Sequence, residues 1–108
     1  MTHSAAMTFE ELSHFTTRVV ALLDDESYGE LQMALHRRPD LGRLIRGSGG
    51  LRKVRWAAKG RGKRGGVRVI YYWWVADSLI TFCDIYPKNE KEDLTSHEIQ
   101  KLRQQLES

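Results

Sequence analysis

The chain has 108 residues and a formal net charge of +3; 41% of its residues are hydrophobic and 29% are charged. This length suits one small core, so we expect a single domain spanning residues 1–108. No apolar run approaches the roughly 18 residues of a membrane span, no signal peptide is recognisable, and the lone Cys83 excludes an intramolecular disulfide, so we expect a cytoplasmic protein without membrane association.

The first forty residues predict a short strand followed by two helices. Residues 7–11 suit an edge strand, and residues 13–23 suit a helix with Ser13 as its N-cap. Asp25 can cap a second helix, which Pro39 ends. The apolar positions at helical spacing are Phe15, Val19, Val20 and Leu23 in the first helix and Tyr28, Leu31, Ala34 and Leu35 in the second.

The middle of the chain predicts a sheet. Residues 51–57 alternate in polarity, residues 67–74 are rich in β-branched and aromatic side chains, and residues 79–86 alternate again. The short link at residues 76–78 predicts a hairpin between the last two strands. In the strand at 67–74, one pair of alternating rings must fill the core: either Tyr71 with Trp73 or Tyr72 with Trp74.

A last helix follows Pro87. Thr95 and Glu98 have the spacing of a capping box, and the apolar stripe after them contains Ile99, Leu102 and Leu106. The predicted fold class is therefore α+β: two N-terminal helices packed on a small, largely antiparallel sheet of three or four strands, with a C-terminal helix.

The distribution of charge is more informative than its sum. Residues 43–68 contain ten of the 17 Lys and Arg and none of the 14 Asp and Glu. A basic segment on an otherwise acidic chain predicts a polyanionic partner, because each phosphate contact releases counterions. The alternative is a solvated basic loop without function.

A glycine-rich stretch lies within this segment. Residues 60–65 match the dinucleotide pattern GxGxxG, but a strand follows where that fold requires a helix, and the spacing for a Walker loop is absent. We expect a cationic loop that contacts a nucleic-acid backbone, with no cofactor. Its cations are Lys59, Arg61, Lys63 and Arg64.

Four other cations should converge on one face of the sheet. Lys53 and Arg55 share a face of one strand, Arg68 is near the start of its neighbour, and Lys88 follows the last strand. Such a group could hold a scissile phosphate and stabilise the negative charge of its transition state. The alternative is that the four side chains extend from a solvated face.

The remaining candidates are weaker. Trp56 is the ring most suited to stacking on a base at the surface. The four histidines have no metal-ligand spacing, so we expect no metal site; His14 or His36 as a general base is a minor alternative to a surface role.

Three segments carry a family resemblance. The sequence contains GGLRKVR at 49–55, KGRGKRGGVRVIYY at 59–72 and IYPKNE at 85–90, and in this order they resemble the HigB-like branch of the RelE/ParE toxin superfamily. The resemblance implies the RelE-like fold, metal-independent cleavage of mRNA in the ribosomal A site by attack of a ribose 2′-hydroxyl, and inhibition of growth. It also implies a cognate HigA-like antitoxin and contact with the 30S subunit, its rRNA and the mRNA.

The resemblance also implies residue roles. Lys53 and Arg55 match the basic strand pair of RelE-type enzymes, as base or electrostatic stabiliser; Arg68 matches the arginine that holds the transition-state phosphate, and Lys88 lies in the turn that closes the site. The RNA- and ribosome-binding candidates are Arg52, Trp56, Lys59, Arg61, Lys63, Arg64 and Asn89. The chain departs from RelE at three positions: Pro87 replaces a glycine, Asn89 an arginine and Leu94 the stacking tyrosine.

Two other functions are compatible with the same basic face. One is a nucleic-acid-binding module without catalysis. The other is poisoning of DNA gyrase through protein contact, as in ParE-like members of the superfamily. The dense cations on the central strands favour the nuclease, because a protein-binding poison needs no phosphate pocket.

Overall fold

The computed structural model describes residues 6–57 and 66–108. Four of the predicted backbone-binding cations lie outside the described residues: Lys59, Arg61, Lys63 and Arg64. The strands of the described part are β1 (Thr8–Glu11), β2 (Arg43–Leu44), β3 (Arg52–Trp56), β4 (Val67–Trp74) and β5 (Leu79–Pro87). Its helices are α1 (Ser13–Leu22), α2 (Asp25–Arg37), the short 3-10 helix η1 (Val75–Asp77) and α3 (Ser96–Glu107).

The described strands form one five-stranded mixed sheet in the order β1-β5-β4-β3-β2. β1 pairs with β5 in parallel, and the other neighbours are antiparallel, including the predicted β4–β5 hairpin. The α+β class is confirmed, whereas the expected three or four strands become five. β2 accounts for the difference, because two residues are too few to show an alternating pattern.

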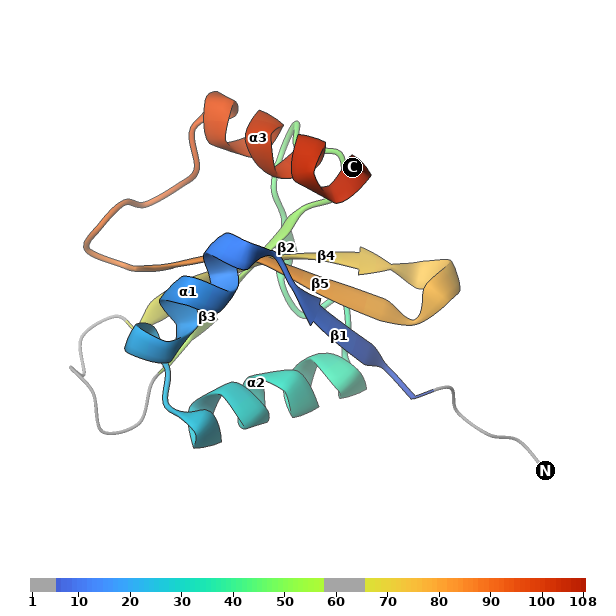
Figure 1. Cartoon of the computed structure of the whole chain (residues 1–108), viewed down its shortest axis with the longest axis vertical. Helices are drawn as coiled ribbons and strands as arrows, with labels where there is room; N and C mark the ends of the chain where they lie inside the picture. Colours follow the sequence, from blue (N-terminus) through green and yellow to red (C-terminus); the bar gives the residue numbers. More distant parts are fainter. Residues whose placement is uncertain (1–5, 58–65) are drawn as a thin grey trace.

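The helices cover both faces of the sheet (Figure 1). α1 and α2 pack on one face, and α3 lies on the other. The core on the α1–α2 face contains Phe15, Val19, Leu23, Leu31, Leu35, Val54, Val67, Val69, Tyr71, Ile80, Phe82 and Ile85. The core under α3 contains Leu51, Ile70, Cys83, Tyr86 and Leu102.

The helix starts differ in part from the prediction. Thr95 and Glu98 form the predicted capping box, with both reciprocal hydrogen bonds present. Ser13 is the first residue of α1 and caps nothing, since Leu12 holds the N-cap position. Asp24, and not Asp25, caps α2 by accepting a hydrogen bond from the Ser27 amide. Adjacent acidic residues offer two possible caps, and the backbone of Asp24 has the extended conformation that a cap needs.

The burial of individual side chains shows which ring pair of β4 fills the α1–α2 core and corrects the expectation for Val20. Tyr71 and Trp73 face the α1–α2 core, and Tyr71 is fully buried. Tyr72 and Trp74 face the other way and pack edge to face against each other, with ring centroids 4.7 Å apart. Val20 was expected in the buried stripe of α1 but is 74% exposed, because α1 buries its Phe15 and Val19 side instead.

No helix within residues 6–57 and 66–108 has both the length and the apolar character needed to cross a membrane.

Candidate functional site

Four cations occupy neighbouring positions on the α3 face of the sheet. Arg55 on β3 pairs with Arg68 on β4, and Lys53 on β3 pairs with Arg43 on β2. Lys53 and Arg55 are two residues apart and therefore share this face. Tyr86 pairs with Arg68 from the other side and belongs to the core under α3, which fixes the face. We call Arg43, Lys53, Arg55 and Arg68 the cation cluster.

The members of the cation cluster differ in exposure. Arg68 is only 3% exposed, whereas Arg55 and Arg43 are exposed. Like charges directly opposite each other on antiparallel strands cost free energy. A bound anion would relieve the repulsion between Arg55 and Arg68. Arg68 is buried and Arg55 is exposed, so such an anion would be accessible from the Arg55 side.

An acidic residue contacts the cation cluster. The Lys53 ammonium lies 2.5 Å from the Asp93 carboxylate and also donates to the Glu92 carbonyl at 3.4 Å. The hydrogen bond from Lys53 holds the pKa of Asp93 below its usual value, and the charges of Lys53, Arg55 and Arg68 act in the same direction. An ionised carboxylate thus lies against Lys53, within the field of the cation cluster. No local pattern in the sequence predicts this contact.

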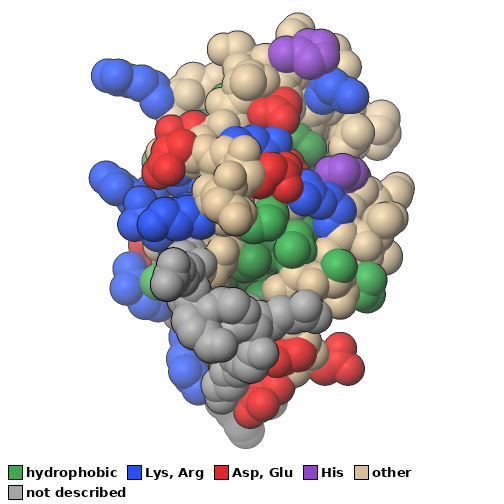
Figure 2. Space-filling view, turned by 90° about the vertical axis from the view of Figure 1, so that its left-hand side faces the viewer, with side chains coloured by type: hydrophobic (Ala, Val, Ile, Leu, Met, Phe, Trp, Pro, Cys, Tyr) green, Lys and Arg blue, Asp and Glu red, His purple; other side chains and the backbone are tan. Residues whose placement is uncertain are grey.

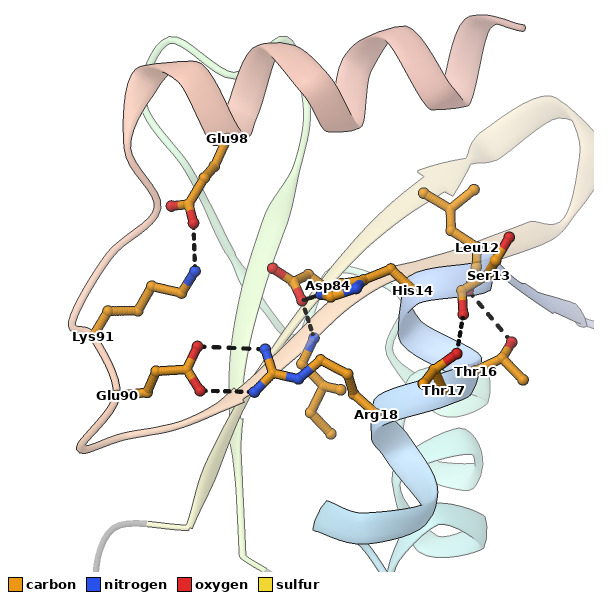
Figure 3. A network of polar contacts seen from close by, with 11 residues as sticks. Leu12, Ser13, His14, Thr16, Thr17, Arg18, Asp84, Glu90, Lys91 and Glu98 are labelled. Carbon is orange, nitrogen blue, oxygen red and sulfur yellow. Dashed lines mark hydrogen bonds and ion pairs between the residues drawn. The ribbon is translucent and has the colours of Figure 1, made fainter.

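In the segment that carries Asp93, residues 88–95, two adjacent residues, Glu90 and Lys91, form ion pairs with the helices (Figure 3). Arg18 on α1 donates two hydrogen bonds, of 2.7 and 3.4 Å, to the Glu90 carboxylate. Lys91 pairs with Glu98 on α3 at 2.6 Å. These contacts tie the segment to α1 and α3, two to three residues before Asp93.

Tyr86 is a second residue that the sequence did not single out. Its side chain is fully buried beside Arg68, and the Lys91 ammonium lies 4.9 Å from the centre of its ring. Burial raises the pKa of Tyr86 to about 12, so the phenol keeps its proton at neutral pH. Its hydroxyl has no hydrogen-bond partner among the described residues.

Two predicted RNA-binding residues, Arg52 and Trp56, have side chains on the opposite face of the sheet from the cation cluster. Arg52 points to the opposite face and donates to the carbonyl of Gly42 at 2.8 Å. Trp56 was expected to be exposed at the surface, but its side chain is half-buried. Its ring packs against the α1–α2 core, and its indole N–H donates to the Ser27 carbonyl at 3.0 Å.

The remaining predicted residues lie at the end of β5. The Lys88 amide donates to the carbonyl of Gly66 at 3.3 Å, which brings Lys88 next to the start of the Arg68 strand. Lys88 and Asn89 are both exposed. The structure therefore brings Lys53, Arg55 and Arg68 together and leaves the Lys88 backbone at their border.

Two hollows open beside Lys53. The first has a volume of about 400 Å³ and includes Arg43, Arg55 and Trp56 in its lining. The second, of about 460 Å³, lies between β2 and the start of α3. Figure 2 shows one face of the molecule, on which Lys and Arg side chains gather along one edge.

In the described part of the chain, no three His, Cys, Asp or Glu side chains lie close enough together to hold a metal ion. His14 pairs with Asp84 at 3.5 Å, with 56% of the histidine side chain exposed. His36 is exposed on α2, on the far side of the sheet from the cation cluster.

The family follows from comparison with known proteins. Residues 40–107 match the model of the family described as the RelE toxin of the RelE / RelB toxin-antitoxin system. The chain belongs to this family, and it is therefore a toxin of the toxin–antitoxin type.

A solved structure of the E. coli toxin RelE, an arginine double mutant in the free state, matches with a TM-score of 0.63. The match has 10% sequence identity and covers 94% of this chain and 99% of that chain. At this identity the likeness concerns the fold, and it confirms the RelE-like arrangement of helices and sheet.

Proposed function

We propose that this toxin is a ribosome-dependent endoribonuclease of the HigB-like branch that cleaves mRNA in the ribosomal A site and thereby stops translation and growth. The observation that carries the proposal is the register of β3 and β4, in which Arg55 lies opposite the buried Arg68 with Lys53 beside them. A phosphodiester suits this group of cations, because the arginine guanidinium pairs bidentately with phosphate oxygens.

The reaction would be an internal displacement. The ribose 2′-oxygen attacks the adjacent phosphorus and gives up its proton to a base, and the 5′-oxygen leaves and takes up a proton. The products are a 2′,3′-cyclic phosphate and a 5′-hydroxyl end. Negative charge grows on the phosphate oxygens in the transition state, and Arg55 and Arg68 would stabilise that charge where water is partly excluded.

Lys53 and Lys88 would complete the charge around the phosphate. Lys53 lies two residues before Arg55 on β3, and its ammonium contacts the Asp93 carboxylate. Lys88 follows β5 at the border of the site. Asn89 and the loop cations Lys59, Arg61, Lys63 and Arg64 are proposed to contact RNA around the cleaved codon, which would place the activity in the cytoplasm, where ribosomes are.

The proposal includes a cognate antitoxin. The family is that of a toxin–antitoxin pair, and the HigB-like sequence segments favour a HigA-like partner. Growth arrest on expression of the toxin, reversed by co-expression of the antitoxin encoded beside it, would support this pairing.

The decisive experiment maps the 5′ ends of cellular mRNA after controlled expression of the wild type and of Arg55→Ala. Arg55 is exposed, so its replacement should leave folding intact. We expect new 5′-hydroxyl ends inside translated codons, and a loss of about 10²-fold or more in cleavage rate for the variant. Arg37→Ala, an exposed arginine at the end of α2, is the matched control and should cleave like the wild type.

Other results would redirect the function. Growth arrest with intact mRNA and inhibited DNA supercoiling would favour the ParE-like gyrase poison. RNA binding without new ends would favour a binding module without catalysis.

A further inference from the structure

A fourth cation of the cluster lies on a strand that the sequence did not predict. Arg43 on β2 pairs with Lys53 on β3, and β2 is the edge strand, so the Arg43 side chain extends the cluster to the edge of the sheet. Arg46 follows three residues later, just beyond β2. Both arginines are exposed, and neither has an acidic partner among the described residues.

These two arginines line the hollow of about 460 Å³ between β2 and the start of α3. Lys53 and Asp93 border the same hollow, so it opens directly beside the proposed cleavage site. The other lining residues are Leu44, Ile45, Leu94, Ser96 and Ile99.

The lining of this hollow contains both apolar and charged or polar side chains. Ile45, Leu94 and Ile99 are partly buried hydrophobic side chains that pack on the core under α3. Ser96 and Asp93 add polar groups, and Arg43 and Arg46 add unpaired positive charge. A nucleotide has the complementary parts: a flat base with apolar faces and polar edges, and a charged phosphate.

We propose that this hollow is a subsite for the ribonucleotide next to the cleaved one, with its phosphate held by Arg43 and Arg46 and its base resting on Leu94 and Ile99. The inference rests on the proposed ribonuclease function and extends it to residues outside the cation pair Arg55–Arg68. Because both arginines are exposed and unpaired, they can bind a phosphate without first breaking an ion pair.

The test uses the full-length toxin and ribosomes programmed with an mRNA whose A-site codon carries 2′-O-methyl groups, so that binding occurs without cleavage. Affinity is measured by fluorescence anisotropy over a range of salt concentrations for the wild type, Arg43→Ala, Arg46→Ala and the control Arg37→Ala. We expect each of the first two substitutions to weaken binding about tenfold. Each should also reduce the salt dependence, log K against log salt, by roughly 0.7 for one lost contact to a single strand. Arg37→Ala should bind like the wild type.

A second arm separates mRNA from rRNA as the source of the phosphate. On ribosomes whose mRNA ends at the P-site codon, the wild type and the Arg43 and Arg46 variants should bind equally weakly. If the variants lose the same factor there, the arginines contact rRNA and the subsite is disproved. If both variants match Arg37→Ala on the full mRNA while Arg55→Ala binds poorly, the subsite is also disproved but the proposed function stands. If the wild type itself does not distinguish the two kinds of ribosome, the proposed function fails.

Discussion

The Lys53 ammonium lies 2.5 Å from the Asp93 carboxylate, although the two residues are 40 positions apart in the chain. Asp93 therefore sets a negative charge against the cation cluster that we propose binds a phosphodiester. Lys53 lowers the pKa of Asp93, so the carboxylate stays ionised through the neutral range. An RNA phosphate that reaches Lys53 has to compete with this internal anion.

The first prediction concerns that competition. Asp93→Asn removes the charge and keeps the size of the side chain, so RNA should bind more tightly. The Asp93 side chain is 71% exposed, and solvent screens its charge, so we expect a gain of only roughly two- to fivefold at low salt. The measurement is the affinity for a programmed ribosome with a 2′-O-methylated A-site codon.

Its control is Asp40→Asn, which removes an exposed charge near the end of α2 and should leave the affinity unchanged. Weaker binding by Asp93→Asn would refute the competition. Unchanged affinity with slower cleavage would instead assign Asp93 a role in the chemical step.

The second prediction concerns the hydroxyl of Tyr71, which positions the chain before β2. This hydroxyl accepts a hydrogen bond from the Gly42 amide at 2.8 Å and donates to the Pro39 carbonyl at 2.7 Å. Tyr71→Phe removes the hydroxyl and leaves the Gly42 amide and the Pro39 carbonyl without this hydrogen-bond partner. Because these groups are largely shielded from water, the substitution should lower the free energy of unfolding by about 1–3 kcal/mol. Urea denaturation would measure the loss.

The matched control is Tyr72→Phe on the other face of β4. The Tyr72 hydroxyl makes no hydrogen bond with a described residue, and its replacement should cost less than about 0.5 kcal/mol. Equal losses in the two variants would show that the hydroxyl of Tyr71 contributes nothing specific.

The third prediction concerns the pH dependence of stability through Asp84. Burial raises the pKa of this carboxyl, and the opposing effects of the Ile85 amide, His14, Lys91 and Arg18 are smaller. A carboxyl with a raised folded-state pKa binds its proton more tightly in the folded than in the unfolded chain. Its ionisation therefore costs stability as the pH rises from the unfolded pKa through the folded one.

Asp84→Asn removes that ionisation and should melt at a higher temperature than the wild type at pH 7. The difference should shrink as the pH falls, and it should vanish below the usual carboxyl pKa of 3.8. Asp77→Asn, which removes an exposed carboxyl in η1, is the control for the loss of one negative charge. A stabilising effect of Asp84→Asn that grew towards acid pH would contradict the argument.

Local patterns in the sequence were sufficient for much of the fold. Alternation and β-branched residues predicted β3, β4 and β5, and the Thr95–Glu98 spacing predicted the start of α3. These features depend on residues a few positions apart. β2 was missed because it is held by pairing with β3 and by the hydrogen bond from Ile45 to Leu51, which no local pattern records.

Local patterns also predicted part of the site. Lys53, Arg55 and Arg68 could be placed on one face because strand periodicity fixes side-chain direction. Asp93 contacts Lys53, which lies 40 residues away in the chain. Trp56, whose exposure was mispredicted, donates to the carbonyl of Ser27, which lies 29 residues away. Arg43 depends on the unpredicted β2. The missing parts of the site are therefore those made by long-range contacts.

The last prediction concerns the capping box at the start of α3. The Thr95 hydroxyl accepts from the Glu98 amide at 3.1 Å, and the Glu98 carboxylate accepts from the Thr95 amide at 2.8 Å. Thr95→Ala should lower the free energy of unfolding by about 1 kcal/mol and speed amide hydrogen exchange in residues 96–107. Thr95→Ser keeps the hydroxyl and should retain most of the protection. If Thr95→Ser lost as much as Thr95→Ala, the cap would not be what stabilises this helix, and packing of Leu102 on the sheet would have to account for it.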